Sequence, residues 1–158
     1  MEQETKPTAV PKFRYKSFTY RTRIEWVGGR AGSLGSEGKQ GFRVASPPEF
    51  KGEAGVWCPE DLFVASVNAC VMATFAAFLD RLQAPVVSYD CIAEGLLEFS
   101  EGKYRITRVT LRPSVVVNRV EAVAPVQKAL HDAHDSCIIS NSITAAVVLE
   151  PQVSVRSE

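Results

Sequence analysis

The spacing of hydrophobic and polar residues changes several times along this chain, and each change predicts an element. Bulky and polar residues alternate over residues 13–27, which is typical of one or two antiparallel strands, and residues 42–45 predict a further short strand. Residues 28–41 hold six glycines, so we expect the backbone to turn sharply there. Residues 1–12 contain two prolines and four charges and are expected to form an N-terminal arm.

Residues 59–82 predict a long helix, because no proline or glycine follows Pro59 in this segment. Pro59 in the first helical position, with Glu60 and Asp61 in the first turn, is a typical helix start. The segment is apolar around its circumference as far as Asp80, so we expect the helix to be buried on most faces. Small residues give it a smooth surface that another element can approach closely: Ala65, Ser66, Ala69, Cys70, Ala73 and Ala77.

After Pro85 the alternating pattern of strands returns. The predicted elements are two strands, a second helix and a last strand: residues 86–99, 104–118, 124–136 and 142–155. We expect residues 100–103 to form the hairpin turn between the two strands, and Pro125 to lie in the first turn of the second helix. This order predicts an α+β fold, with residues 1–158 forming one domain.

Charge and hydropathy narrow the classes of partner. Lys and Arg total 18, as do Asp and Glu, so the neutral chain has no basic footprint for nucleic acid or an anionic membrane surface. No window approaches the roughly 18 consecutive apolar residues that a membrane-spanning helix needs. The N-terminus also lacks the apolar stretch of a secretory signal. We therefore expect a cytoplasmic protein with neither a nucleic-acid nor a membrane partner.

Four cysteines, Cys58, Cys70, Cys91 and Cys137, are the candidates for chemistry. In a reducing compartment they are not expected to form a structural disulfide framework, and the chain has no CxxC pair. Cys91 fits a buried strand residue, and Cys58, beside Pro59, fits a helix cap or a surface residue. Cys70 lies in mid-helix and Cys137 where the second helix ends, so their sulfurs could come within disulfide range. Spacing alone does not show that they meet, and buried inert thiols are the commoner case.

A metal site is the alternative that His131, His134 and Cys137 suggest. Six positions along a helix rotate the chain by ~240°, so His131 and Cys137 point to different sides. Two imidazoles alone make a weak site. We expect both histidines on a solvent-exposed helix face, and neither a metal nor a bound cofactor.

Four segments resemble the OsmC/Ohr family of organic hydroperoxide resistance proteins. They are VGGRAG at residues 27–32, SPPEFKGEAGVWCPEDLF at 46–63, VASVNACVMATF at 64–75 and AHDSCIISNSI at 133–143. Their order and separations fit the family. The most specific part is the PED-x(8)-C arrangement together with the later C-x-x-SN.

The resemblance implies a stress-response peroxidase that reduces organic hydroperoxides. Cys70 matches the family's peroxidatic cysteine and Cys137 its resolving cysteine, Arg30 matches the arginine that pairs with the thiolate, and Glu60 matches the carboxylate that holds this arginine. The implied fold is an intertwined α+β homodimer, with antiparallel sheets around a long buried helix and two active sites at the subunit interface. The implied partners are an organic hydroperoxide and an external dithiol, for which a lipoyl-type group is one candidate.

Two departures from the family pattern leave the substrate open. Ile138 stands where the peroxidases commonly have proline, and the SPPEF loop with Cys58 resembles a broader OsmC-like branch. A hydroperoxide with a hydrocarbon tail needs an apolar pocket. Candidate walls, each equally compatible with core packing, are Phe75, Phe78, Ile138 and Ile139.

The chemistry itself requires charged residues near Cys70. Burial among apolar residues raises the pKa of a thiol, so a reactive Cys70 needs a cation such as Arg30, which in turn needs a carboxylate such as Glu60. If Glu60 and Cys70 lie on one continuous helix, ten residues separate them by ~15 Å. Either the PED segment folds back, or Glu60 acts with the Cys70 of a second copy. The alternatives to an efficient enzyme are a redox-sensing dimer and a dimer that binds a small hydrophobic ligand.

Overall fold

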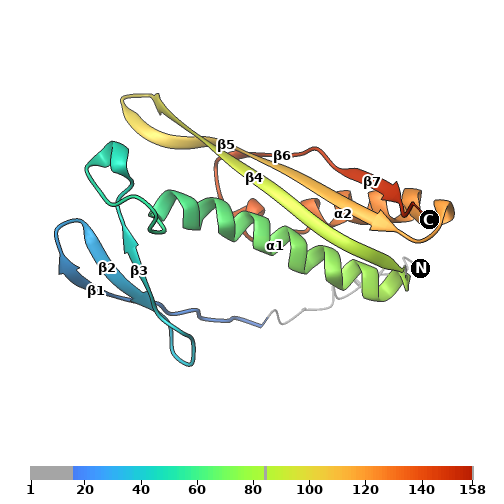
Figure 1. Cartoon of the computed structure of the whole chain (residues 1–158), viewed down its shortest axis with the longest axis horizontal. Helices are drawn as coiled ribbons and strands as arrows, with labels where there is room; N and C mark the ends of the chain where they lie inside the picture. The colour runs from blue at the N-terminus through green and yellow to red at the C-terminus, as the bar shows by residue number, and fades with distance from the viewer. Residues whose placement is uncertain (1–15, 84, 158) are drawn as a thin grey trace, which may run out of the picture.

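Two sheets and two helices make up the fold (Figure 1), and the computed structural model describes residues 16–83 and 85–157. The elements in chain order are β1 (Arg23–Gly28), β2 (Ala31–Gly35), β3 (Phe42–Ala45), α1 (Pro59–Leu82), β4 (Val86–Ser100), β5 (Lys103–Val117), α2 (Val123–Asp135), β6 (Ala146–Leu149) and β7 (Gln152–Val155). Three short 3-10 helices connect them: η1 (Pro48–Phe50), η2 (Val120–Ala122) and η3 (Ser140–Ser142). The predicted α+β class is confirmed. The predicted arm over residues 1–12 lies outside the described residues.

The larger sheet is a long antiparallel hairpin, β4–β5, with two short strands added to β5. The hairpin turn falls at residues 100–103 as predicted, where Glu101 (φ 53°) and Gly102 (φ 81°) take left-handed conformations. Strands β6 and β7 run parallel to β5 and pair with successive parts of it. The prediction of one last strand over residues 142–155 is wrong, because Pro151 lacks the N–H that would continue the ladder.

Helix α1 has the predicted bounds but not the predicted burial. Cys58 and Asp61 form a capping box at its start, and Gln83 ends it in a left-handed conformation (φ 48°). Its fully buried residues are Val67, Val71 and Phe75. Met72, on another face, is 43% exposed. A helix buried on most faces is therefore not what the single chain shows, because the hairpin and α2 cover only one stripe of it.

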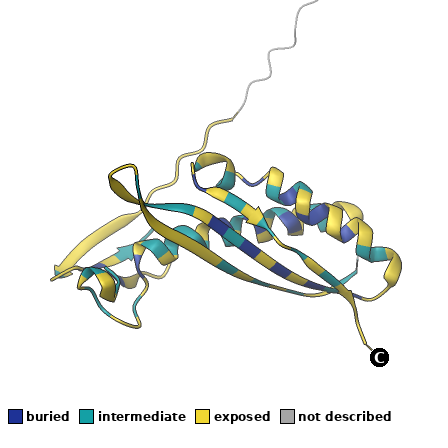
Figure 2. Cartoon of the chain, turned by 90° about the horizontal axis from the view of Figure 1, so that it is seen from above, coloured by how far each residue is buried: buried dark blue, intermediate teal, exposed yellow. Residues whose placement is uncertain are grey.

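The core lies between the larger sheet and the two helices, where Figure 2 shows the buried residues gathered. Alternate residues of β5 point into this core, as period two requires. One cluster contains Phe75, Val115 and Leu130, and a second contains Leu111 and Cys137. Helix α2 closes the core at Val123–Asp135, within one residue of its predicted bounds.

The smaller sheet, in the order β1-β2-β3, lies beyond the N-terminal end of α1 (Figure 1). The strand predicted over residues 13–27 is present only from Arg23, since residues 16–22 form no strand and residues 13–15 are not described. Strand β2 was not predicted, because its glycines resemble turn residues. Gly32 instead allows close packing, since a Cβ there would lie 2.8 Å from Cγ1 of Ile24.

By length and composition alone, α1 is also long and apolar enough to cross a membrane. This corrects the expectation that no window of the chain approaches that limit. The core helix of a soluble protein can have the same length and hydropathy, so one such helix is weak support for a membrane segment.

Candidate active site

The middle of α1 and the segment after α2 meet in the second core cluster. Cys137 is the second residue after α2, and it is fully buried in this cluster beside Val67 and Leu111. Cys70 is half-buried and packs against the same cluster from α1. Both thiols are free. The fold thus brings together the two cysteines that sequence spacing alone did not connect.

Hydrogen bonds lower the pKa of the Cys70 thiol. Burial is the largest single influence and acts to raise this pKa, because it disfavours the thiolate. The backbone N–H of Ile139, the side chains of Cys137 and Thr74 and the backbone N–H of Ile138 act in the opposite direction. Together they outweigh burial, so the pKa of Cys70 lies below its usual value. The thiolate is the nucleophilic form of cysteine, so this environment favours reactivity.

A tight turn after α2 provides the backbone donors. The N–H of Cys137 donates to the carbonyl of His134 at 3.2 Å, and the carbonyl of Cys137 accepts from Asn141 N at 3.0 Å. The Cys137 sulfur accepts from Ser140 N at 3.4 Å. Ile138 and Ile139, whose backbone N–H groups act to lower the pKa of Cys70, lie within this turn. The conformation of the turn thus helps to stabilise a thiolate at Cys70.

Arg30 lies in the turn between β1 and β2, where Gly28 (φ 110°) and Gly29 (φ 54°) reverse the chain. Its side chain is exposed, and its Nη1 donates to the carbonyl of Phe50. Its own carbonyl accepts from Ser46 N at 3.0 Å. Among the described residues, the structure brings Arg30 to the 46–52 segment and not to Cys70.

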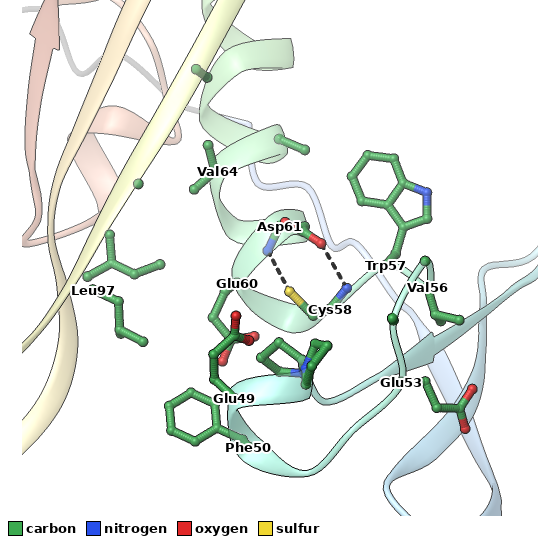
Figure 3. A pocket seen from close by; sticks show the side chains of 18 of the residues that line it. Glu49, Phe50, Glu53, Val56, Trp57, Cys58, Glu60, Asp61, Val64 and Leu97 are labelled. Carbon is green, nitrogen blue, oxygen red and sulfur yellow. Dashed lines mark hydrogen bonds between the residues drawn. The ribbon is translucent and has the colours of Figure 1, made fainter.

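Glu60 lies in the first turn of α1, and Cys70 follows on the same continuous helix. The ~15 Å that ten helical residues span therefore separates them in the single chain. Figure 3 shows the Glu60 side chain directed toward Glu49 and Phe50, at the end of a cleft. Its Oε2 is buried and has no hydrogen-bond partner in the described part of the chain. Arg30 and Glu60 thus both lie at the Phe50 segment, away from Cys70.

The two remaining cysteines have environments opposite to that of Cys70. Cys58 is buried and its sulfur accepts from Asp61 N at 3.3 Å, so its predicted cap role is confirmed. Burial raises the pKa of Cys58 to about 11. Cys91 is half-buried on β4, and burial raises its pKa as well. Both thiols are kept in the unreactive protonated form at neutral pH.

The four proposed pocket walls do not lie together. Ile139 packs against the cluster that holds the cysteines, and Ile138 beside it is 74% exposed. Phe75 is buried in the other cluster, with its ring 5.5 Å from that of Tyr89. Phe78 packs on that cluster too, with the Arg81 guanidinium above its ring. The two isoleucines are therefore beside Cys70, and the two phenylalanines serve the core.

A cleft that the sequence did not predict opens between η1, the start of α1 and the β4–β5 hairpin (Figure 3). Its volume is about 720 Å³. Apolar side chains from all three elements line much of it: Phe50, Val64, Leu97 and Ile106. Asn68, two residues before Cys70, is among its lining residues. The sequence signal that could have predicted this cleft is Phe50 in the proline-rich loop, because an aromatic side chain there needs a surface to pack on.

The histidines differ from each other in environment. His131 is exposed as expected, whereas His134 is half-buried with Nε2 3.2 Å from the carbonyl of Val147. In residues 16–83 and 85–157, no group of three or more His, Cys, Asp or Glu side chains is placed to hold a metal ion.

The chain thus combines an α+β fold with two free cysteines that pack on the same core cluster. One of them lies on the long helix α1 and the other just after α2. The family described as OsmC-like protein matches residues 52–152, and the chain belongs to this family.

Individual relatives agree with this assignment. The uncharacterized protein YmaD of Bacillus subtilis is 26% identical over 139 residues, which cover 85% of this chain and 92% of YmaD. An OsmC-like protein of unknown function from Vibrio cholerae is 26% identical with a TM-score of 0.78, over 85% of this chain and 99% of that one. An organic hydroperoxide resistance protein from Elizabethkingia anophelis shares the fold, with 22% identity, a TM-score of 0.70 and coverage of 89% and 99%.

Proposed function

We propose that this protein is a thiol peroxidase that reduces organic hydroperoxides through Cys70 and Cys137. The observation that carries the proposal is the packing of Cys137 against a Cys70 whose pKa is lowered by its hydrogen bonds. A structural neighbour at 22% identity is named as an organic hydroperoxide resistance protein, and this name supports the same substrate class. The family assignment is compatible with it.

The reaction proceeds in three balanced steps. The Cys70 thiolate attacks the outer oxygen of the hydroperoxide, the O–O bond breaks, and the leaving alkoxide takes up a proton to become an alcohol. Cys70 is then a sulfenic acid, and the Cys137 thiol condenses with it to form a disulfide and release water. An external dithiol reduces this disulfide by exchange and is itself oxidised to a disulfide. A lipoyl-type dithiol is one candidate reductant, and no bound cofactor is needed.

Arg30 and Glu60 complete the site in this proposal. A guanidinium beside Cys70 stabilises the thiolate, and a carboxylate neutralises and orients that guanidinium. Since Glu60 and Cys70 are ~15 Å apart on one helix, we propose that Arg30 and Glu60 of one copy act on the Cys70 of a second copy. The exposed apolar face of α1, which includes Met72, supports a homodimer because such a face is costly to leave in water.

The hydrocarbon tail of the substrate requires an apolar surface close to Cys70. Ile138 and Ile139 lie beside that thiol and supply part of it. The cleft lined by Val64 and Leu97 supplies a further apolar surface along the same helix. Ile138 replaces the proline that is common in the family, so we expect the shape of this wall, and with it the preferred tail, to differ from that of typical members.

Peroxide consumption by the reduced protein tests the proposal. With cumene hydroperoxide and excess dithiol, we expect steady turnover in the wild type and loss of at least about a thousandfold in Cys70→Ser, because the nucleophile is gone. Cys137→Ser is expected to react once and then to accumulate sulfinic acid at Cys70, detected as a gain of two oxygens by mass spectrometry. Cys91→Ser is the matched control, and its rate should be unchanged.

The same experiment separates the enzyme from its alternatives. Equal slow peroxide loss in the wild type and all three variants would rule out the peroxidase. Formation of the Cys70–Cys137 disulfide without sustained turnover would instead favour the redox-sensing dimer.

A further inference from the structure

Residues 46–52 form a closed turn against which Arg30 lies (Figure 3 shows Phe50 and Glu49 within it). Two contacts join the turn to Arg30. Ser46 N donates to the Arg30 carbonyl at 3.0 Å, and the Arg30 Nη1 donates to the Phe50 carbonyl. One contact holds the backbone of the arginine and the other holds its charged end.

The turn is closed by its own hydrogen bonds. Both Phe50 N and Gly52 N donate to the carbonyl of Pro47 at 3.0 Å, and Lys51 N donates to the carbonyl of Pro48 at 2.9 Å. Its downstream end is fixed where Glu53 N donates to the Ser46 carbonyl at 3.0 Å. Each of these bonds constrains where the Phe50 carbonyl points.

Two backbone positions make the turn sensitive to substitution. Lys51 has φ 61°, a left-handed conformation that a β-branched residue strongly disfavours. Gly52 passes so close to Ser46 that a Cβ would lie 1.6 Å from the Ser46 carbonyl oxygen. An alanine at position 52 therefore cannot be accommodated without opening the turn.

The Glu53 carboxylate ties this turn to β3. Arg43 donates to it with two nitrogens, Nε to Oε2 at 2.9 Å and Nη2 to Oε1 at 2.6 Å. This fork geometry is more specific in orientation than a single contact. The turn is therefore anchored at both ends to the smaller sheet that carries Arg30.

We propose that the 46–52 turn is the positioning element of Arg30, aligning its guanidinium through the Phe50 carbonyl. An exposed arginine samples many rotamers, so a fixed acceptor restricts it before it meets its target. A guanidinium has five N–H donors, so the bond to Phe50 leaves others for a thiolate and for Glu60. This inference rests on the proposed role of Arg30 toward Cys70, and it adds the residues that position the arginine.

Cys70 reactivity in Gly52→Ala tests the proposal. The pH dependence of Cys70 alkylation by iodoacetamide is followed in the reduced full-length protein, with the modified peptide quantified by mass spectrometry. We expect the midpoint to rise by about one pH unit, which corresponds to about a tenfold loss of thiolate near neutral pH. Gly35→Ala is the matched control, since a Cβ there meets nothing closer than 3.7 Å, and its midpoint should not change.

Lys51 provides a second, milder pair of variants in case Gly52→Ala does not fold. Lys51→Val disfavours the left-handed conformation and is expected to raise the midpoint, whereas Lys51→Gly tolerates it and should leave the midpoint unchanged or slightly lower. Melting temperatures are measured for every variant. An unchanged midpoint in a folded Gly52→Ala or Lys51→Val would overturn the positioning role.

Combination with Arg30→Ala separates this proposal from the proposed function. If the turn acts through Arg30, Gly52→Ala and Lys51→Val have no further effect on the midpoint in an Arg30→Ala background. If Arg30→Ala alone leaves the midpoint unchanged, the proposed role of Arg30 is wrong. A midpoint that moves with Arg30→Ala but not with the turn variants contradicts only the positioning proposal, as does an additive shift in the double variants.

Discussion

The cysteine pair and the Arg30–Glu60 side of the proposed site are built differently. Cys70 and Cys137 meet inside a core cluster that one chain completes, between α1, β5 and the turn after α2. Arg30 and Glu60 lie at the other end, beside the 46–52 turn and the start of α1. There the Arg30 side chain is exposed, and the buried Glu60 Oε2 has no hydrogen-bond partner among the described residues. The difference shows that a single chain brings the two cysteines together, and it motivates the proposal that their charged partners come from a second copy.

Mixing two inactive variants tests this comparison with the largest expected effect. In a shared site, a dimer of Cys70→Ser with Arg30→Ala regains one intact site out of two. Random association makes half of the dimers mixed, so co-refolding should restore about a quarter of wild-type activity from near-background components. The measurement is the peroxidase rate before and after co-refolding. No recovery would mean that arginine and cysteine act within one chain.

A second mixture is the control for this experiment. Cys70 and Cys137 belong to the same chain, so Cys70→Ser mixed with Cys137→Ser should not regain sustained turnover. Recovery in this mixture would contradict the pairing of the two cysteines within one core cluster.

Leu111→Ala tests how far the core supports the cysteine side. Leu111 is fully buried on β5 in the cluster with Cys137, so truncation should cost about 2–5 kcal/mol in the free energy of unfolding. Val120→Ala, at a residue 67% exposed, should change it by less than about 0.5 kcal/mol. Chemical denaturation measures both. A loss below about 1 kcal/mol at Leu111 would show that this cluster is loosely packed.

Selective alkylation compares the thiols of the two regions. Hydrogen bonds hold the pKa of Cys70 below its usual value, whereas burial raises the pKa of Cys58 to about 11. Below both pKa values, the thiolate fraction falls tenfold for each unit by which the pKa is higher. At pH 7 iodoacetamide should therefore modify Cys70 at least about a hundredfold faster than Cys58, and the ratio should shrink as pH rises above the pKa of Cys70. Peptide mass spectrometry measures both rates, and equal rates would contradict the assignment.

Cys58→Ala has the smallest expected effect and acts on the Arg30–Glu60 side. It removes the sulfur that accepts from Asp61 N at the start of α1, so the protein should lose about 1 kcal/mol of stability. Cys58→Ser keeps a side-chain acceptor for the cap and should retain most of this stability. Thermal denaturation compares the two, and equal stability of both variants would show that the sulfur cap contributes little.

Local patterns in the sequence predicted the long helix well. Pro59 and the following acids mark the start of α1, and the absence of proline and glycine carries it to Leu82. The hairpin turn and α2 also agree closely, because turn residues and Pro125 act over a few neighbouring positions. Strand β2 was missed because a glycine in the sequence can indicate either a turn or a close packing contact. Gly32 makes a close contact with Ile24.

The candidate site, too, was predicted only in part from the sequence. The motif around Cys70 and Cys137 could be recognised from residue types, but their contact depends on how α1 and α2 pack. Phe75 and Phe78 were plausible pocket walls in the sequence, yet both pack on the core cluster that contains Val115 and Leu130. Period and composition identify an apolar face without indicating what covers it.

The sequence by itself determined the α+β class, the bounds of α1 and the two cysteines as candidates for chemistry, since these depend on local propensity and short-range patterns. Only the tertiary structure decided that Cys70 and Ile139 pack on the cluster that contains Cys137, and that the Phe50 carbonyl accepts from Arg30. It also decided that α1 exposes an apolar face in the single chain. These features join residues far apart in the chain, and their geometry follows from packing, which no local pattern encodes.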